Sequence, residues 1–501
     1  MLLIKSGTLV TASETYQADI LIEDEKIIRI SAPSLRHGER KSNRQDSASL
    51  SADPEAGSAQ VIDASGKLIL PGGIDPHTHF DLPMFDTVSS DDHYTGHKAA
   101  AFGGTTTVMD FVPLTPSPLP LGEGQKGEGD FKYSVDLWME KAQKAAIDYS
   151  FHMNLTRFDD KLEKEIPSLM DMGITTLKVF TAYNGRLRLD DGGIFKALRV
   201  AKENGMLVMA HCENGDVIET LIPEALAAGH TTPEWHALTR PGWGAVEATL
   251  RVAGMAAEAD AAVYIVHMNM GGEVDMLQYA RERGVKVMGE TCPPYLFFTM
   301  DHLRRPDGSK WICSPPMRSE KDNARLWEGL TNGILQTVGT DHCPFFYDGT
   351  KPIMYEGQEV VIPGKELGRD DFTKIPNGLP GVQDRMPILW TYGVRAGRIT
   401  PNQFVAYTST NPARIFGLYP RKGALVPGAD ADILIWDPEK KIKYGVAHSH
   451  QRTDYNLYEG WELVGYPEKV FLRGKLIVDG EQWLGRRGDG RFLKRGQGEV
   501  L

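Results

Sequence analysis

Three shortages narrow the classes of protein that this sequence can encode. Only four of its 501 residues are cysteine (Cys212, Cys292, Cys313 and Cys343), and no two form a Cys-x-x-Cys pair. Neither a disulfide framework nor a thiolate zinc site is therefore expected, and we predict small buried thiols beside the active site. No segment approaches the roughly 18 uninterrupted apolar residues of a membrane span, and the N-terminus alternates like a β-strand, so we expect a cytoplasmic protein with no membrane partner.

Basic residues are outnumbered by acidic ones, 55 to 67. The formal net charge is −12, and the only dense basic stretch, residues 36–44, lies in a polar loop. This balance argues against nucleic acid as a partner. The composition is otherwise that of a globular protein, 41% hydrophobic and 24% charged, in a chain long enough for a barrel and a smaller accessory domain.

Both ends of the chain carry alternating runs that are typical of β-strands. Residues 2–7 and 20–30 near the start are matched by 431–436 and 469–478 near the end. The simplest interpretation is a small β-sandwich domain built from residues 1–66 and 419–480. A C-terminal tail, 481–501, would follow, and we expect its Arg- and Gly-rich part from Arg486 either to be mobile or to pack on a neighbouring subunit.

Between these ends, residues 67–418 alternate short apolar runs with helical patterns, which indicates βα units and a parallel sheet. Eight candidate strands can be named: 68–79, 104–112, 149–155, 174–181, 206–212, 262–268, 285–290 and 334–341. Eight units predict an α/β fold, a (β/α)₈ TIM barrel whose active site lies at the C-terminal ends of its strands. Three insertions interrupt the pattern, at 31–60, 114–130 and 349–364. We expect disorder in the first two, while the third follows Asp341 closely enough to leave a role in substrate access open.

The motif His77-Thr78-His79 ends the first predicted strand. Side chains two residues apart on a strand project from the same face, so both imidazoles can bind one metal ion. The motif alone is weak, but four more possible ligands lie at or near the ends of other predicted strands: Lys178, His211, His267 and Asp341. A barrel would bring all six to one rim.

Imidazole and carboxylate are suitable ligands for zinc or manganese. A bound metal lowers the pKa of its water from about 15.7 to roughly 7, which supplies hydroxide at neutral pH, so hydrolysis is the natural use of such a site. Two metal ions would also need a bridging anion. Lys178 does not fit this site as an ordinary lysine, because an ammonium with a pKa of about 10.4 would repel the metal ions.

At these residues the chain resembles the hydantoinase and dihydropyrimidinase family of cyclic amidohydrolases. The resemblance covers nearly the whole chain, and an ordered set of segments is far more specific than any one of them. The segments are GGIDPHTH at 72–79, AHCENG at 210–215, CSPPMR at 313–318, DHCPF at 341–345, ELGR at 366–369, IPNG at 375–378, NPAR at 411–414 and QRTDYNL at 451–457.

The resemblance implies a barrel with a β-sandwich partner and two divalent metal ions, zinc in the first place and manganese as the alternative. One metal ion would be bound by His77, His79, Lys178 and Asp341, and a more exposed one by Lys178, His211 and His267. Lys178 would have reacted with carbon dioxide to give N6-carboxylysine, whose carbamate would bridge the two ions.

The resemblance also implies a set of catalytic roles. Tyr183 would donate a hydrogen bond to the developing oxyanion, and main-chain groups of Ser314 and Asn377 would orient a cyclic diamide substrate. Asp341 would accept the proton of the attacking hydroxide and pass it to the leaving ring nitrogen. The implied reaction is the hydrolytic ring opening of 5,6-dihydropyrimidines or 5-monosubstituted hydantoins to N-carbamoyl amino acids by a homotetramer, or alternatively a homodimer.

Specificity is less visible in the sequence. Comparison with the family places five apolar residues in loops near the substituent of the substrate ring: Leu82, Met84, Phe85, Phe180 and Leu187. These residues suit an alkyl or aromatic substituent, although they are equally able to pack the loops against each other. The other histidines are expected at the surface, at helix caps or in support of the site.

Other functions compete with this interpretation. Dihydroorotases usually carry an Arg two residues after the second His of the motif, where this chain has Asp81. Allantoinase is a closer alternative, although the segments at 87–92 and 451–456 look more like a hydantoinase. The family also includes noncatalytic interaction scaffolds that have lost metal ligands, but here all six ligand positions are filled.

Overall fold

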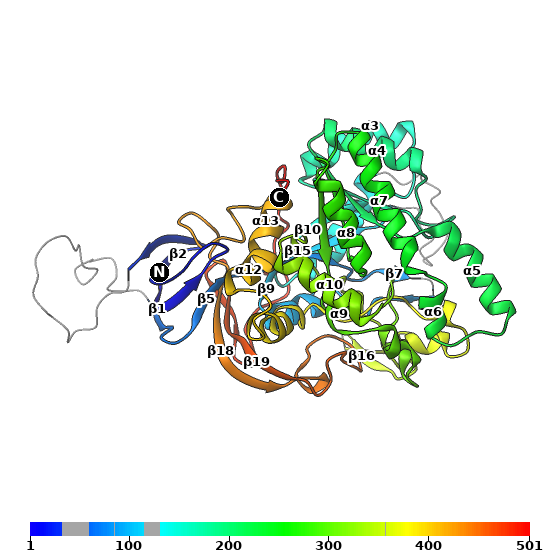
Figure 1. Cartoon of the computed structure of the whole chain (residues 1–501). Helices are drawn as coiled ribbons and strands as arrows, with labels where there is room; N and C mark the ends of the chain where they lie inside the picture. The colour runs from blue at the N-terminus through cyan, green and yellow to red at the C-terminus, as the bar shows by residue number, and fades with distance from the viewer. Residues whose placement is uncertain (33–59, 85, 115–130, 356) are drawn as a thin grey trace, which may run out of the picture.

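The computed structural model describes residues 1–32, 60–84, 86–114, 131–355 and 357–501 (Figure 1). The chain forms two large sheets, one inside a layer of helices and one built from both chain ends. The insertions predicted at 31–60 and 114–130 lie almost entirely outside the described residues.

Eight parallel strands form a nearly closed barrel in the order β15-β14-β13-β12-β11-β10-β9-β6. A bridge between Thr78 and His342 joins the end of the first strand to the chain that leaves the last. The strands are β6 (Gly73–Thr78), β9 (Thr105–Val112), β10 (Asp148–Asn154), β11 (Thr176–Phe180), β12 (Leu207–His211), β13 (Val263–Ile265), β14 (Val287–Thr291) and β15 (Thr337–Val338). The predicted (β/α)₈ barrel is confirmed.

Helices surround the barrel, and their ends follow local sequence signals. In α3 the Asp159 side chain caps the first turn by accepting from the main-chain N–H groups of Lys161 and Leu162, and the helix ends at Gly173 with φ of 81°. The helices are α1 (Thr95–Phe102), α2 (Phe131–Lys141), α3 (Asp160–Met172), α4 (Asp191–Glu203), α5 (Gly215–Ala227), α6 (Glu234–Leu238), α7 (Gly242–Glu258), α8 (Gly271–Arg281), α9 (Pro293–Phe297), α10 (Glu320–Thr331), α11 (Arg385–Leu389), α12 (Pro401–Val405) and α13 (Asn411–Ile415).

Alternate strand residues fill the barrel interior. Met109 and Phe111 on β9 and Leu207 and Met209 on β12 belong to one buried cluster, as expected for side chains two residues apart on a strand. The same cluster includes Phe416, which follows α13. The interior is therefore a packed core, and chemistry is left to the strand ends.

The second sheet confirms the predicted β-domain built from both termini. It runs in the order β21-β20-β19-β18-β5-β1-β2-β3, with β4 paired to β1, and lies beside the barrel in Figure 1. Its strands are β1 (Leu2–Val10), β2 (Thr15–Glu23), β3 (Lys26–Ser31), β4 (Gln60–Asp63), β5 (Leu68–Pro71), β18 (Ile433–Lys443), β19 (Glu462–Leu472), β20 (Lys475–Asp479) and β21 (Gln482–Trp483). The run predicted as one barrel strand, 68–79, is thus divided: β5 pairs with β1 and β18, and the barrel strand begins at Gly73.

The C-terminal tail packs on the barrel of its own chain, a contact that was not among the expectations for it. Phe492 forms a bridge with Tyr149 at the start of β10, and Leu493 is completely buried in the barrel cluster. Arg495 is 4% exposed and donates to the Ser150 hydroxyl (2.9 Å). The Arg- and Gly-rich composition of the tail did not predict these contacts.

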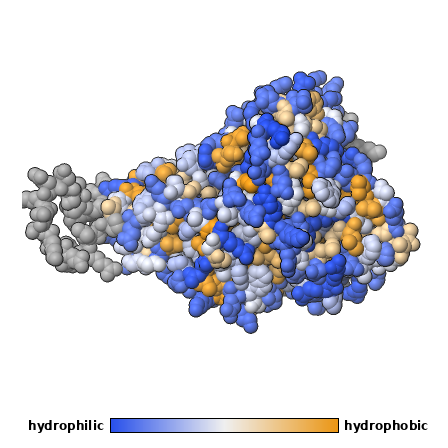
Figure 2. Space-filling view, in the orientation of Figure 1, coloured by the Kyte–Doolittle hydropathy of each residue, from blue (hydrophilic) through white to orange (hydrophobic). Residues whose placement is uncertain are grey.

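No helix in the described ranges is both long enough and apolar enough to cross a bilayer. On the face shown in Figure 2, hydrophilic side chains predominate and apolar ones lie in separate clusters.

Candidate metal centre and active site

One cavity of about 720 Å³ lies at the C-terminal ends of the barrel strands. All nine predicted site residues line it: His77, His79, Lys178, Tyr183, His211, His267, Ser314, Asp341 and Asn377. These residues are spread over most of the barrel sequence, so the fold itself brings them together.

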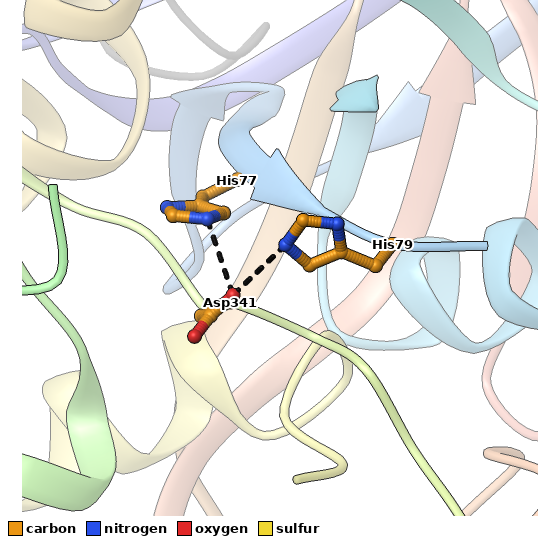
Figure 3. A group of neighbouring side chains, drawn as sticks. All are labelled: His77, His79 and Asp341. Atoms are coloured by element: carbon orange, nitrogen blue, oxygen red, sulfur yellow. Dashed lines mark hydrogen bonds and ion pairs between the residues drawn. The ribbon is translucent and has the colours of Figure 1, made fainter. Parts of the chain in front are cut away.

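The first group of possible ligands is His77, His79 and Asp341 (Figure 3). The Nε2 atoms of His77 and His79 lie 3.1 Å and 3.0 Å from Oδ1 of Asp341. One ligand atom from each residue lies within 4.8 Å of the others. Two imidazoles and a carboxylate at this spacing fit a divalent cation.

His211 and His267 form a second group beside the first. Nδ1 of His211 lies 2.9 Å from Nε2 of His267. The ring centroids of His77 and His267 are 5.4 Å apart, so the two groups adjoin. Such convergence of nitrogen atoms fits a second cation position.

The protonation states favour cation binding at most of these residues. Burial lowers the pKa of His79 and His211 and holds that of His267 well below its usual value, so these rings are neutral ligands near pH 7. Burial also lowers the pKa of His77, but Asp341 and Glu290 outweigh it and raise the pKa to about 9. A cation at this position would replace that proton.

Lys178 lies inside the barrel mouth with its side chain 2% exposed. Its Nζ is 4.9 Å from the Phe111 ring centroid, and the ring of His77 is 4.6 Å from the same centroid. Burial lowers the pKa of this lysine to about 8, although Asp341 and Glu290 act in the opposite direction. An appreciable fraction of the amine is therefore neutral.

Two supporting carboxylates were missed by sequence reasoning. Glu290 on β14 faces His77, with its Oε1 2.7 Å from Nδ1 of that ring. Glu213 does the same for His211, with its Oε2 2.9 Å from Nε2. These contacts leave Nε2 of His77 and Nδ1 of His211 as the ligand atoms, which are the atoms that converge. Glu290 ends the strand predicted at 285–290, so the strand-end criterion that selected the histidine ligands could have identified it as well.

Tyr183 stands at the cavity wall beside the second group. Its ring centroid is 5.3 Å from that of His211. Burial raises the pKa of its hydroxyl, which therefore stays protonated and able to donate a hydrogen bond. Tyr183, His267 and Asp341 all have positive φ, of 68°, 40° and 52°, a conformation that is uncommon for residues other than glycine and is often found at functional sites.

Part of the cavity wall is apolar. Leu82, Met84, Phe180 and Leu187 line it as expected, and Phe85 lies outside the described residues. Trp138 and Leu114 add to this wall and were not anticipated.

The third predicted insertion forms the hairpin β16 (Ile353–Tyr355) and β17 (Gln358–Val360). Its described residues do not line the cavity. They pack against the loop that does, because the Tyr355 hydroxyl donates to Asp92 (2.6 Å) and the Thr87 hydroxyl donates to the Pro363 carbonyl. The hairpin therefore braces the loop that carries Leu82 and Met84.

Asp81 does not line the cavity and lies 3.4 Å from Nζ of Lys144. Five of the histidines that were expected at the surface, at caps or in support of the site are buried: His93, His97, His152, His236 and His342. All four cysteines are buried and free, and Cys343 lines the cavity.

Comparison with known proteins agrees with this geometry. Residues 68–477 match the model of the Amidohydrolase family. A D-hydantoinase from Geobacillus stearothermophilus is 42% identical over 98% of this chain and 96% of its own length. The crystal structure of dihydropyrimidinase from Brevibacillus agri NCHU1002 superposes with a TM-score of 0.89 at 44% identity and covers 99% of both chains.

A more distant structure, the L-hydantoinase from Arthrobacter aurescens, gives a TM-score of 0.81 at 26% identity and covers 98% of this chain and 99% of its own. Such matches in sequence and structure extend from one end of the chain to the other. The family implies divalent metal ions, and the cluster of His77, His79 and Asp341 is suited to hold one. The chain belongs to the amidohydrolase family, in the group of the hydantoinases and dihydropyrimidinases.

Proposed function

We propose that this protein opens the ring of 5,6-dihydropyrimidines or 5-monosubstituted hydantoins by hydrolysis and releases N-carbamoyl amino acids. The observation that carries the proposal is one cavity in which the six predicted metal ligands meet Tyr183, Ser314 and Asn377. Relatives named D-hydantoinase and dihydropyrimidinase, similar over the full length, support it.

The proposal includes two divalent metal ions, with zinc preferred and manganese as the alternative. His77, His79 and Asp341 would hold one ion, and His211 and His267 the other. Lys178 would be carboxylated and would supply the anionic group shared by both, which removes the repulsion that an ammonium would exert. When bound, such ions lower the pKa of a water molecule and polarise a carbonyl group.

The chain's own residues would then direct the reaction. Asp341 is ionised, because its contacts with His77 and His79 outweigh burial and hold its pKa well below the usual value. It would take a proton from the attacking water and give it to the ring nitrogen as the C–N bond breaks. The protonated hydroxyl of Tyr183 would stabilise the oxyanion, and main-chain groups of Ser314 and Asn377 would hold the ring.

The apolar wall supports a substrate with an alkyl or aromatic substituent. The test is ring-opening absorbance of the zinc-loaded protein with dihydrouracil, hydantoin, both enantiomers of phenylhydantoin, and allantoin. We expect turnover of dihydrouracil, hydantoin and phenylhydantoin, and loss of this activity after the metal is removed by a chelator. Preferred turnover of allantoin would favour an allantoinase, and inactivity on every ring would favour a scaffold.

We extend the proposal to a homotetramer, with a homodimer as the alternative. Some large apolar side chains are exposed in the single chain, including Trp243 (76%) and Met354 (70%). Trp243 lies in α7 and Met354 in β16, and single exposed apolar residues are normal on a monomer, so the family resemblance and not this exposure supports the tetramer. Light scattering coupled to size-exclusion chromatography would measure the mass.

A further inference from the structure

Two main-chain segments carry the groups that the proposed function assigns to ring binding. Ser314 follows Ile312 and Cys313, and Asn377 lies between Pro376 and Gly378. The segments are joined, because the Gly378 N–H donates to the Ile312 carbonyl (3.1 Å). Behind each segment lies a buried side-chain donor that the catalytic roles leave unused.

The first donor is Lys365, which is 1% exposed. Its Nζ donates to the Pro376 carbonyl (3.1 Å) and to the Ile312 carbonyl (3.0 Å), so it bridges the two segments. No carboxylate of the described chain lies within ion-pair distance of it, and burial lowers its pKa to about 7. Burying an amine without an opposite charge costs free energy. The two carbonyl groups that accept from Lys365 beside the cavity therefore point to a role for this side chain in holding the two segments.

The second donor is His236, also 1% exposed. Its Nδ1 lies 3.2 Å from Nη1 of Arg240, and a guanidinium can only donate, so Nδ1 must accept. The ring proton therefore lies on Nε2, which donates to the Cys313 carbonyl (2.8 Å). Burial holds the pKa of His236 well below its usual value, so the ring stays neutral in this tautomer.

These two acceptors belong to the peptide groups that carry the N–H groups of Asn377 and Ser314, which line the cavity and donate to no acceptor within the described residues. The Pro376 carbonyl and the Asn377 N–H are parts of one conjugated peptide unit, and so are the Cys313 carbonyl and the Ser314 N–H. Donation to the oxygen of a peptide draws electrons toward it and strengthens its N–H as a donor, because hydrogen bonds in a chain polarise one another. Both units are therefore backed by a donor on the side away from their N–H groups.

We propose that Lys365 and His236 are positioning residues that fix and polarise the two peptide groups on which the substrate ring is bound, with Arg240 setting the tautomer of His236. This inference rests on the proposed function. It deepens that function by assigning the strength of ring recognition to side chains that do not touch the substrate.

The test compares Lys365→Met and His236→Leu with the wild type, all loaded with zinc, on dihydrouracil and phenylhydantoin. Ring binding is made equally before and during the reaction, so its loss raises KM more than it lowers kcat. We expect KM to rise about tenfold for each variant on both rings, with kcat changed less than about threefold. Bound zinc should stay at the wild-type amount.

Three further variants separate positioning from general damage. Gln places its amide nitrogen near the position of Nε2, so His236→Gln should recover most of the lost affinity. Lys374→Met removes a lysine from the same loop whose side chain is 68% exposed, and it should leave KM unchanged. Lys365→Gln keeps a shorter neutral donor, and it replaces Lys365→Met in the comparison if the methionine variant does not fold.

The outcomes are distinguishable. A wild-type protein that opens neither ring removes the proposed function, and this inference with it. Wild-type turnover combined with wild-type KM in the folded Lys365 and His236 variants overturns the inference and leaves the function standing. A lower melting temperature with unchanged KM shows a merely structural role and also overturns it.

Discussion

The sharpest test of the metal centre is the substitution Glu290→Gln, which keeps the shape of a buried side chain and removes its charge. Glu290 is fully buried and accepts from Nδ1 of His77 (2.7 Å), from the His267 N–H (3.1 Å) and from the Tyr264 hydroxyl (2.9 Å). It thus orients one predicted ligand from each group. Loss of a carboxylate that supports a metal-binding histidine typically lowers metal affinity by about 10- to 100-fold, which is about 1.4 to 2.7 kcal/mol.

The assay is competition for zinc between the metal-free protein and a chromophoric chelator. We expect weaker binding by Glu290→Gln within this range, and recovery of turnover when zinc is in excess. The matched control is Glu273→Gln, because this buried carboxylate accepts from the N–H groups of Asn269 (2.9 Å) and Met270 (3.0 Å) and contacts no predicted ligand. Wild-type affinity in Glu290→Gln, or an equal loss in the control, would refute the reasoning.

Three further predictions concern catalysis, specificity and stability. Tyr183→Phe should lower kcat by about 10²- to 10³-fold, the usual effect of removing one oxyanion donor, with zinc content intact by atomic absorption; unchanged turnover would remove Tyr183 from the mechanism. Leu187→Glu should change kcat/KM for phenylhydantoin more than for dihydrouracil, and an equal effect on both would argue against a pocket role. Leu493→Ala should lower the free energy of unfolding by about 2–5 kcal/mol in urea titrations, because this side chain is completely buried under the barrel; no loss would contradict the packing of the tail.

Much of the barrel was predictable because buried parallel strands are short apolar runs between helices. The runs predicted at 104–112 and 206–212 correspond closely to β9 (Thr105–Val112) and β12 (Leu207–His211). The candidate site was predictable for a related reason: strand ends in this fold converge, so a polar residue that ends an apolar run marks the rim. Pattern and position selected the six candidate ligands, and the family resemblance added Tyr183, Ser314 and Asn377, which line the same cavity.

Pairing partners were not predictable from the same pattern. Leu68–Pro71 is as apolar as a barrel strand, but β5 pairs with β1 and β18, and no local signal distinguishes the two sheets. The tail shows the same limit, since the burial of Leu493 depends on β10 and α13 and not on its neighbours in sequence. The positive φ of His267 and Asp341 likewise has no marker, because neither residue is glycine.

Buried polar residues are the other group whose partners sequence patterns did not identify, and several of them contact the candidate site. His342, expected at the surface, at a cap or in support of the site, has its Nε2 3.1 Å from Oδ2 of Asp91 and accepts at Nδ1 from the Gly381 N–H (3.1 Å). Its carbonyl accepts from the His79 N–H (2.7 Å). Burying a polar group is costly unless such partners satisfy it. In this chain those partners are distant in sequence, so the residues next to a histidine or lysine in the sequence do not reveal its role. Its role is inferred from whether its neighbours in space carry the groups that are proposed to react. By that criterion Glu290, Lys365 and His236 belong to the proposed site together with the predicted ligands.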